Sequence, residues 1–158
     1  MGKKIDSFPL VARFNTFHIR GYEKYVGTKT NIWITCLDRR IPDECKHYDL
    51  VLHVKSGFVL DRNYRNLCDR FVNVASIGYL ETTMEVERIM KWSHPSSGAM
   101  ASMYFVQRMY KVYLYGFDHF EAEKHHYGDD EEIGRKHRAD LEKLYFDYMM
   151  REGYVEYF

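Results

Sequence analysis

The chain has 158 residues, of which 46% are hydrophobic, and its 23 basic and 23 acidic side chains give a formal net charge of zero. This length suits one compact domain, so we expect residues 1–158 to form a single domain with a hydrophobic core. The balanced charge excludes a protein that coats nucleic acid or an anionic membrane by charge alone. An aromatic content of 16% excludes intrinsic disorder.

No feature of the sequence predicts export or a membrane span. No apolar run approaches the roughly 18–20 residues that cross a bilayer, and the first residues, MGKKIDSFPLVARFN, lack the apolar segment of a secretory signal. The three cysteines Cys36, Cys45 and Cys68 are too few and too scattered for a disulfide framework or a zinc cage. We therefore expect a soluble cytoplasmic protein with reduced thiols.

Short β-rich runs alternate with helical patterns along the chain. Most of the runs are too apolar to alternate cleanly, which is typical of strands covered on both faces. This order predicts an α/β fold with a Rossmann-like layered, mostly parallel sheet flanked by helices. The predicted strands and helices are, in chain order, Leu10–Phe14, Asn31–Cys36, Asp49–Val54, Phe71–Ala75, a helix over Tyr79–Trp92, a buried helix over Gly98–Met109, and a strand over Lys111–Tyr115.

The last helix has the clearest pattern. Its apolar residues follow the i, i+3, i+4, i+7, i+8 rule, and Gly153 supplies a stop before a short strand over Tyr154–Tyr157. The residues of this apolar stripe are Leu141, Leu144, Tyr145, Tyr148 and Met149.

Ligands of such sheets bind at the carboxyl ends of the strands, which directs attention to the loops after Phe14, Cys36 and Tyr115. Asn15 follows the first strand, where it holds left-handed backbone geometry or points its amide into a ligand cleft. The stretch Gly21–Thr30 is predicted to be a glycine-punctuated loop in which Lys29 meets an anion or is merely exposed.

The loop from His94 to Gly98 leads directly into the buried helix. Its two hydroxyls, its glycine and the first N–H groups of the helix would suit a phosphate or a carboxylate. In the alternative interpretation, Ser96 or Ser97 simply caps the helix.

Histidines are frequent in the last third of the chain, yet the spacing of His119, His125, His126 and His137 is not diagnostic of a metal site. We therefore expect no metal. His137 is predicted to lie at the start of the last helix, where the helix N-terminus and nearby carboxylates oppose each other, so it could act as a general base near neutral pH. His-x4-Glu spacing alone does not identify it, because the pattern occurs three times.

Four motifs in order resemble glycosyltransferase family 29, the animal-type sialyltransferases. The large motif is similar to Ile5-Asp6, Val11 to Asn15, Gly21-Tyr22-Glu23 and Val26 to Thr30. The small motif is similar to Pro95 to Gly98, followed by an apolar helix and Val112 to Phe117. The third motif resembles His126 to Asp129, and the very small motif, His-x4-Glu, falls on His137 and Glu142.

This resemblance implies a variant of the glycosyltransferase-A type of fold and a metal-independent, inverting transfer of a sugar, usually sialic acid, from a CMP-sugar to an acceptor hydroxyl. The acceptor is a glycan, a lipid or another hydroxyl compound, the CMP-sugar is a co-substrate, and no other cofactor is implied. His137 would be the base and His126 would stabilise the departing phosphate. The donor nucleotide would be held by Asn15, Ser96, Ser97, Gly98, Gly116 and Asp118.

The chain begins just downstream of the strand and loop that also contact the nucleotide in this family. An alternative function is therefore an impaired nucleotide- or glycan-binding module, or one part of an assembly. An uncovered sheet edge would then favour a homo-oligomer. The absence of a Golgi-type anchor leads us to expect a bacterial or viral source.

Overall fold

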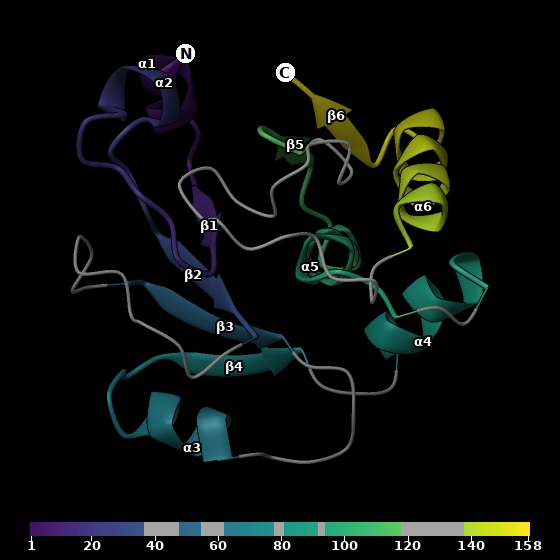
Figure 1. Ribbon diagram of the computed structural model, residues 1–158, viewed down its shortest axis with the longest axis horizontal. Helices are drawn as coiled ribbons and strands as arrows, with labels where there is room; N and C mark the ends of the chain where they lie inside the picture. Colours follow the sequence, from purple (N-terminus) through teal and green to yellow (C-terminus); the bar gives the residue numbers. More distant parts are fainter. Residues whose placement is uncertain (37–47, 55–61, 78–80, 92–93, 118–137) are drawn as a thin grey trace. The chain divides into compact units, whose positions relative to one another are not determined.

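The computed structural model describes residues 1–36, 48–54, 62–77, 81–91, 94–117 and 138–158, and it divides the chain into two compact units, Met1–Gly78 and Tyr79–Phe158 (Figure 1). Each unit is α/β, and all described strand pairs are parallel. The prediction of an α/β fold with a parallel sheet and flanking helices is therefore confirmed. That the whole chain forms one domain stays a prediction.

The N-terminal unit contains a four-stranded sheet in the order β1-β2-β3-β4. The register pairs Phe14 with Ile34, Thr35 with His53, and Val54 with Ile77. The residues described in this unit also form three short helices. The element bounds are α1 Gly2–Asp6, β1 Ala12–Phe14, α2 Glu23–Val26, β2 Ile32–Thr35, β3 Leu50–Val54, α3 Arg62–Cys68 and β4 Val74–Ile77.

The two central strands are buried because their sequences, IWIT and LVLHV, are apolar at nearly every position. Trp33 of β2 is 1% exposed and lies at the centre of the core. Its ring stacks on Tyr48 at 5.4 Å and meets the edge of Phe71 at 5.8 Å. Phe17, Ile19, Val51 and Leu67 complete this buried cluster.

The described part of the C-terminal unit contains three helices and a two-stranded parallel sheet of β5 and β6. Helix α5 is apolar all round and buries Gly98 through Met103, whereas α6 buries one stripe around Tyr145, Phe146 and Met149. The ring of Phe146 contacts those of Phe117 and Tyr157. The bounds are α4 Glu81–Ile89, α5 Ser97–Val106, β5 Val112–Leu114, α6 Ala139–Arg151 and β6 Val155–Tyr157.

Two differences from the sequence prediction concern local structure. The fourth strand begins at Val74 and not at Phe71, because the Phe71 ring packs against Trp33 and Tyr48. Helices α1, α2 and α3 were not expected, and α2 lies within the stretch predicted as a loop. With four to seven residues each, they are too short to show a helical period. In the described part of the chain no helix is long and apolar enough to cross a membrane.

Candidate functional site

The start of α5 is formed by the serine-rich loop that the sequence singled out. Ser96 is the N-cap residue, with extended backbone geometry, and its Oγ accepts a hydrogen bond from the Ala99 N–H at 3.2 Å. This bond satisfies one of the N–H groups that have no partner within the helix. The capping interpretation is thus confirmed for Ser96.

Ser96 also joins α5 to α6. Its Oγ donates to Glu142 Oε1 at 2.5 Å, and its backbone N–H donates to Glu142 Oε2 at 3.3 Å. In a capping box, a glutamate three residues into the same helix accepts the N–H of the N-cap residue. Here that position is Ala99, and the carboxylate comes from the first turn of α6 instead. The segments that resemble the small and the very small motif are therefore in direct contact, through residues 46 positions apart.

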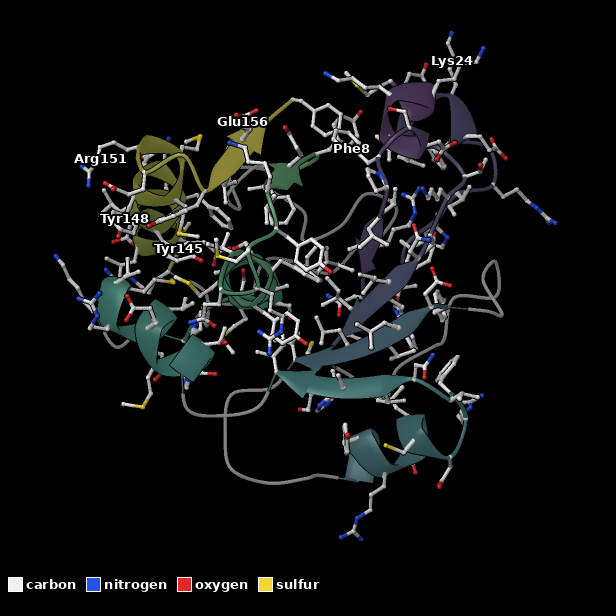
Figure 2. The ribbon with its side chains drawn as sticks, turned by 180° about the vertical axis from the view of Figure 1, so that it is seen from behind. Phe8, Lys24, Tyr145, Tyr148, Arg151 and Glu156 are labelled. Atoms are coloured by element: carbon white, nitrogen blue, oxygen red, sulfur yellow. The ribbon has the colours of Figure 1, made fainter. Side chains whose placement is uncertain are left out.

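A second polar link lies one turn along α6. The Tyr145 hydroxyl donates to the carbonyl of Ala99 at 3.1 Å and lies 3.2 Å from Ser102 Oγ. Figure 2 shows Tyr145 on α6, and its side chain is fully buried. Burial raises the pKa of the Tyr145 phenol, so it stays protonated and available as a donor. Together with Ser96 and Glu142, it fixes the two helices to each other.

Glu142 is buried, with only 3% of the residue exposed. Burial raises its pKa, and the two hydrogen bonds from Ser96 oppose this rise without cancelling it. No cationic side chain among the described residues contributes to the shift. The group therefore takes up a proton at a higher pH than an ordinary glutamate.

Gly98, at the second position of α5, allows an aromatic ring to approach the helix. A Cβ at this position would lie 2.5 Å from Cε1 of Phe117, so any side chain would displace the ring. Gly116, beside Phe117, has φ +74°, a conformation that favours glycine, although open space surrounds it. The loop after β5 thus reaches the start of α5 through Phe117.

Asn15 lies at the carboxyl end of β1 and has φ 47°. Its N–H donates to Ile34 O at 2.7 Å, and its carbonyl accepts from the Trp33 indole N–H at 2.9 Å. The left-handed geometry that the sequence allowed is therefore confirmed. The side-chain oxygen lies 3.6 Å from Cys36 Sγ, which donates to it, so the amide N–H groups are the donors that Asn15 can offer to a ligand.

The first part of the large motif forms a structural lock around Asp6. The carboxylate of Asp6 accepts the N–H groups of Thr28 and Lys29 at 2.9 Å each, as well as the Thr28 hydroxyl. Burial acts to raise the pKa of Asp6, but these hydrogen bonds and the charge of Arg13 outweigh it and lower the pKa. Gly27 has φ +72°, and a Cβ there would collide with the Asp6 carboxylate.

Arg13 and Lys29 complete the lock. The Arg13 guanidinium donates to Val26 O at 2.6 Å and to Thr30 Oγ1 at 2.9 Å. The Lys29 ammonium donates to the carbonyls of Phe8 and Pro9 at 2.5 and 2.9 Å. The position of Lys29 is thus explained by the fold, without an anion.

The structure describes five of the eight predicted site residues. Asn15 belongs to the N-terminal unit, and Ser96, Ser97, Gly98 and Gly116 belong to the C-terminal unit. The other three, Asp118, His126 and His137, lie outside the described residues, as does the third motif. The roles assigned to all eight residues stay predictions. Within the described ranges, no group of three or more His, Cys, Asp and Glu side chains could hold a metal ion.

Nothing in the sequence indicated that Cys36, Ser102 and Tyr145 make hydrogen bonds around the predicted site. Tyr145 fits the apolar stripe of α6, so its hydroxyl gave no separate signal. The bond between Ser96 and Glu142 joins two of the predicted motifs, but the spacing within each motif does not show that the two are in contact.

Comparison with protein families supports the resemblance that the large motif indicated in the N-terminal part of the chain. The model of glycosyltransferase family 29 (sialyltransferase) matches residues 1–60. This match confirms the resemblance to the family over residues that include the Asp6 lock, Arg13 and Asn15. Residues 1–60 are therefore similar in sequence to this family. Comparisons with curated proteins and with solved structures gave no significant match.

Proposed function

We propose that this protein is an inverting, metal-independent glycosyltransferase that moves sialic acid or a related sugar from a CMP-sugar to an acceptor hydroxyl. The family match over residues 1–60 supports the class. The structural observation that carries the proposal is the pair of hydrogen bonds from Ser96 to Glu142, because it joins the proposed nucleotide-binding loop to the helix that follows the proposed base.

The proposed base is His137, which precedes the first residue of α6, Ala139, by two positions. An inverting displacement needs a base on the acceptor side of the sugar and a stabilised leaving group on the other side. His137 would take the proton of the acceptor hydroxyl as the oxygen attacks the sugar. His126 would donate to the phosphate of the departing CMP.

The nucleotide phosphate needs fixed donors if no metal neutralises it. The N–H groups of Ser97 and Gly98 at the start of α5 are suited to this role, since a helix N-terminus favours an anion. The Asn15 amide is a further donor, with its oxygen occupied by Cys36. Gly116 and Asp118 would lie against the ribose or the cytosine.

The first test is a calorimetric titration of the protein with CMP, with UMP and GMP as controls, in the presence and absence of a chelator. We expect CMP to bind in preference to the other two nucleotides and to bind equally well with the chelator. No binding of CMP at millimolar concentration to a folded sample would contradict the proposal. The protein would then be better explained as a glycan-binding module or one part of an assembly.

The second test concerns the base. Substitution His137→Ala should lower turnover of a CMP-sugar by about 100-fold or more, the usual contribution of general-base catalysis, and leave the affinity for CMP unchanged. His18→Ala is the matched control, because His18 and Glu23 have the same His-x4-Glu spacing. Weaker CMP binding with unchanged turnover in His137→Ala would refute the assigned role.

A further inference from the structure

The buried carboxyl group of Glu142 lies at the helix end where the proposed function places the nucleotide phosphate. Its two oxygens accept hydrogen bonds from the backbone N–H of Ser96, at 3.3 Å, and from the Ser96 hydroxyl, at 2.5 Å. The next two N–H groups, those of Ser97 and Gly98, have no acceptor among the described residues. Two anionic groups would therefore share the N-terminus of α5, one from the protein and one from the ligand.

Among the described residues, no cationic side chain acts on Glu142. The described ionisable groups that interact with it are Tyr145 on its own helix and Tyr157 on β6. From α4, Glu85 acts on Tyr145 and adds a further negative charge. The α5 side contributes Ser96, which is neutral. A carboxylate in a nearly water-free place with a phosphate nearby is strongly disfavoured, whereas the neutral acid is not.

We propose that binding of the CMP phosphate at the start of α5 is coupled to uptake of a proton by Glu142. The inference rests on the proposed function, since it requires a CMP-binding site at this helix. The proton comes from the solvent and adds to a carboxylate oxygen of Glu142. The acid O–H can then donate to Ser96 Oγ across the same 2.5 Å contact, while the other oxygen still accepts the Ser96 N–H.

The coupling has a definite sign. Phosphate repels the charged form of Glu142, so the complex holds the proton to a higher pH than the unliganded protein does. By linkage, CMP binds more tightly at low pH and more weakly as Glu142 ionises. Each unit of difference between the two pKa values corresponds to about a tenfold change in affinity.

The experiment measures proton uptake directly, by calorimetric titration at several pH values between 5 and 8 in buffers of different ionisation enthalpy. CMP is compared with cytidine, which lacks the phosphate, on the wild-type protein and on Glu142→Gln. Glutamine keeps an oxygen for the Ser96 N–H and removes the charge. Asp147→Asn is the control, because Asp147 is an exposed carboxylate on the same helix.

We expect the wild type and Asp147→Asn to take up a proton with CMP but not with cytidine, and Glu142→Gln to take up less. The affinity ratio of Glu142→Gln to wild type should rise by about three- to tenfold across this pH range. The phosphate of CMP titrates too, but equally in all three proteins. Equal uptake in wild type and Glu142→Gln would overturn the coupling and leave the proposed function standing, whereas no CMP binding by the wild type would overturn both. If Glu142→Gln does not fold, the carbon-13 chemical shift of the Glu142 carboxyl group in the wild type, followed over the same pH range with and without CMP, decides. A midpoint that CMP does not raise would overturn the coupling.

Discussion

At the scale of the residue, Asn15 combines two properties that the sequence could not separate. Its backbone turns the chain at the end of β1 with φ 47°, which costs little for asparagine compared with other side-chain-bearing residues. Its side chain meets Cys36, which sets the direction of the amide. The positive φ serves the fold, whereas the direction of the amide is what matters for a ligand.

Substitution Asn15→Gly separates these properties. Glycine adopts positive φ without strain, so the free energy of unfolding should change by less than about 1 kcal/mol. The amide is lost, so we expect CMP affinity to fall by about tenfold, the value of one good hydrogen bond to a charged group. Urea denaturation and CMP titration measure the two effects.

Lys91→Gly is the matched control, because Lys91 is exposed and also has positive φ, at 51°. It should leave CMP affinity unchanged. Unchanged CMP affinity in Asn15→Gly as well would remove Asn15 from the donor site.

At the scale of the element, the two longest helices end in the same way but with different residues. After α6, Gly153 has φ +74°, with bonds from Gly153 N to Met150 O and from Tyr154 N to Met149 O. After α5, Met109 holds the corresponding position with φ 64°, and Tyr110 N bonds to Phe105 O. Both are Schellman motifs, and the contact between the rings of Tyr110 and Phe105 is the hydrophobic contact typical of them.

The backbone of Met109 is strained at this positive φ, whereas glycine would adopt the same conformation without strain. Met109 is 92% exposed, so its side chain contributes little packing. We expect Met109→Gly to raise the free energy of unfolding by about 0.5–1 kcal/mol, measured as a higher urea midpoint with an unchanged slope. The opposite change, Gly153→Ala, should lower it by about 1 kcal/mol, because open space surrounds Gly153 and only backbone strain is added. A loss of stability in Met109→Gly would show that the exposed side chain has contacts that outweigh the strain.

At the scale of the whole molecule, a net charge of zero conceals two carboxyl groups that respond to pH in opposite directions. The pKa of Asp6 is lowered in the fold, and that of Glu142 is raised. Asp6 therefore stabilises the protein above its unfolded pKa, near 3.8, and this stabilisation is lost as pH falls through the lowered pKa. Glu142 costs stability as pH rises above its unfolded pKa, near 4.5.

Substitution Asp6→Asn tests the first of these effects. An amide cannot replace the carboxylate that accepts from Thr28 and Lys29, so at pH 7 the variant should be less stable by about 1–2 kcal/mol. This difference should shrink as pH falls from 5 through the lowered pKa of Asp6, because the unfolded wild type takes up a proton near pH 3.8 that the folded protein still excludes. Chemical denaturation across this range gives the measurement, with Glu23→Gln, an exposed carboxylate in the same unit, as the control. A difference that stays constant with pH would show that the charge of Asp6 is not involved.

The sequence by itself determined the class of fold and most of the longer elements. Apolar runs such as IWIT and LVLHV predict strands buried on both faces, and the spacing from Leu141 to Met149 predicts α6, because both periods are properties of the chain alone. The ordered motifs also identified the family that residues 1–60 match. A cap at Ser96 or Ser97 was one of two interpretations of that loop, and Gly153 was predicted as a stop, because capping chemistry is local.

The tertiary structure decided which residues distant in the sequence are in contact. Phe71 lies outside β4, contrary to the prediction, because its ring packs on Trp33. Lys29 donates to the carbonyls of Phe8 and Pro9 because the hydrogen bonds of Asp6 bring these segments of the chain together. The bond from Ser96 to Glu142 joins residues 46 positions apart. Such contacts depend on burial and on the pairing of helices, for which no local period exists. Only the fold therefore shows that the start of α5 and the first turn of α6 share one hydrogen-bonded centre.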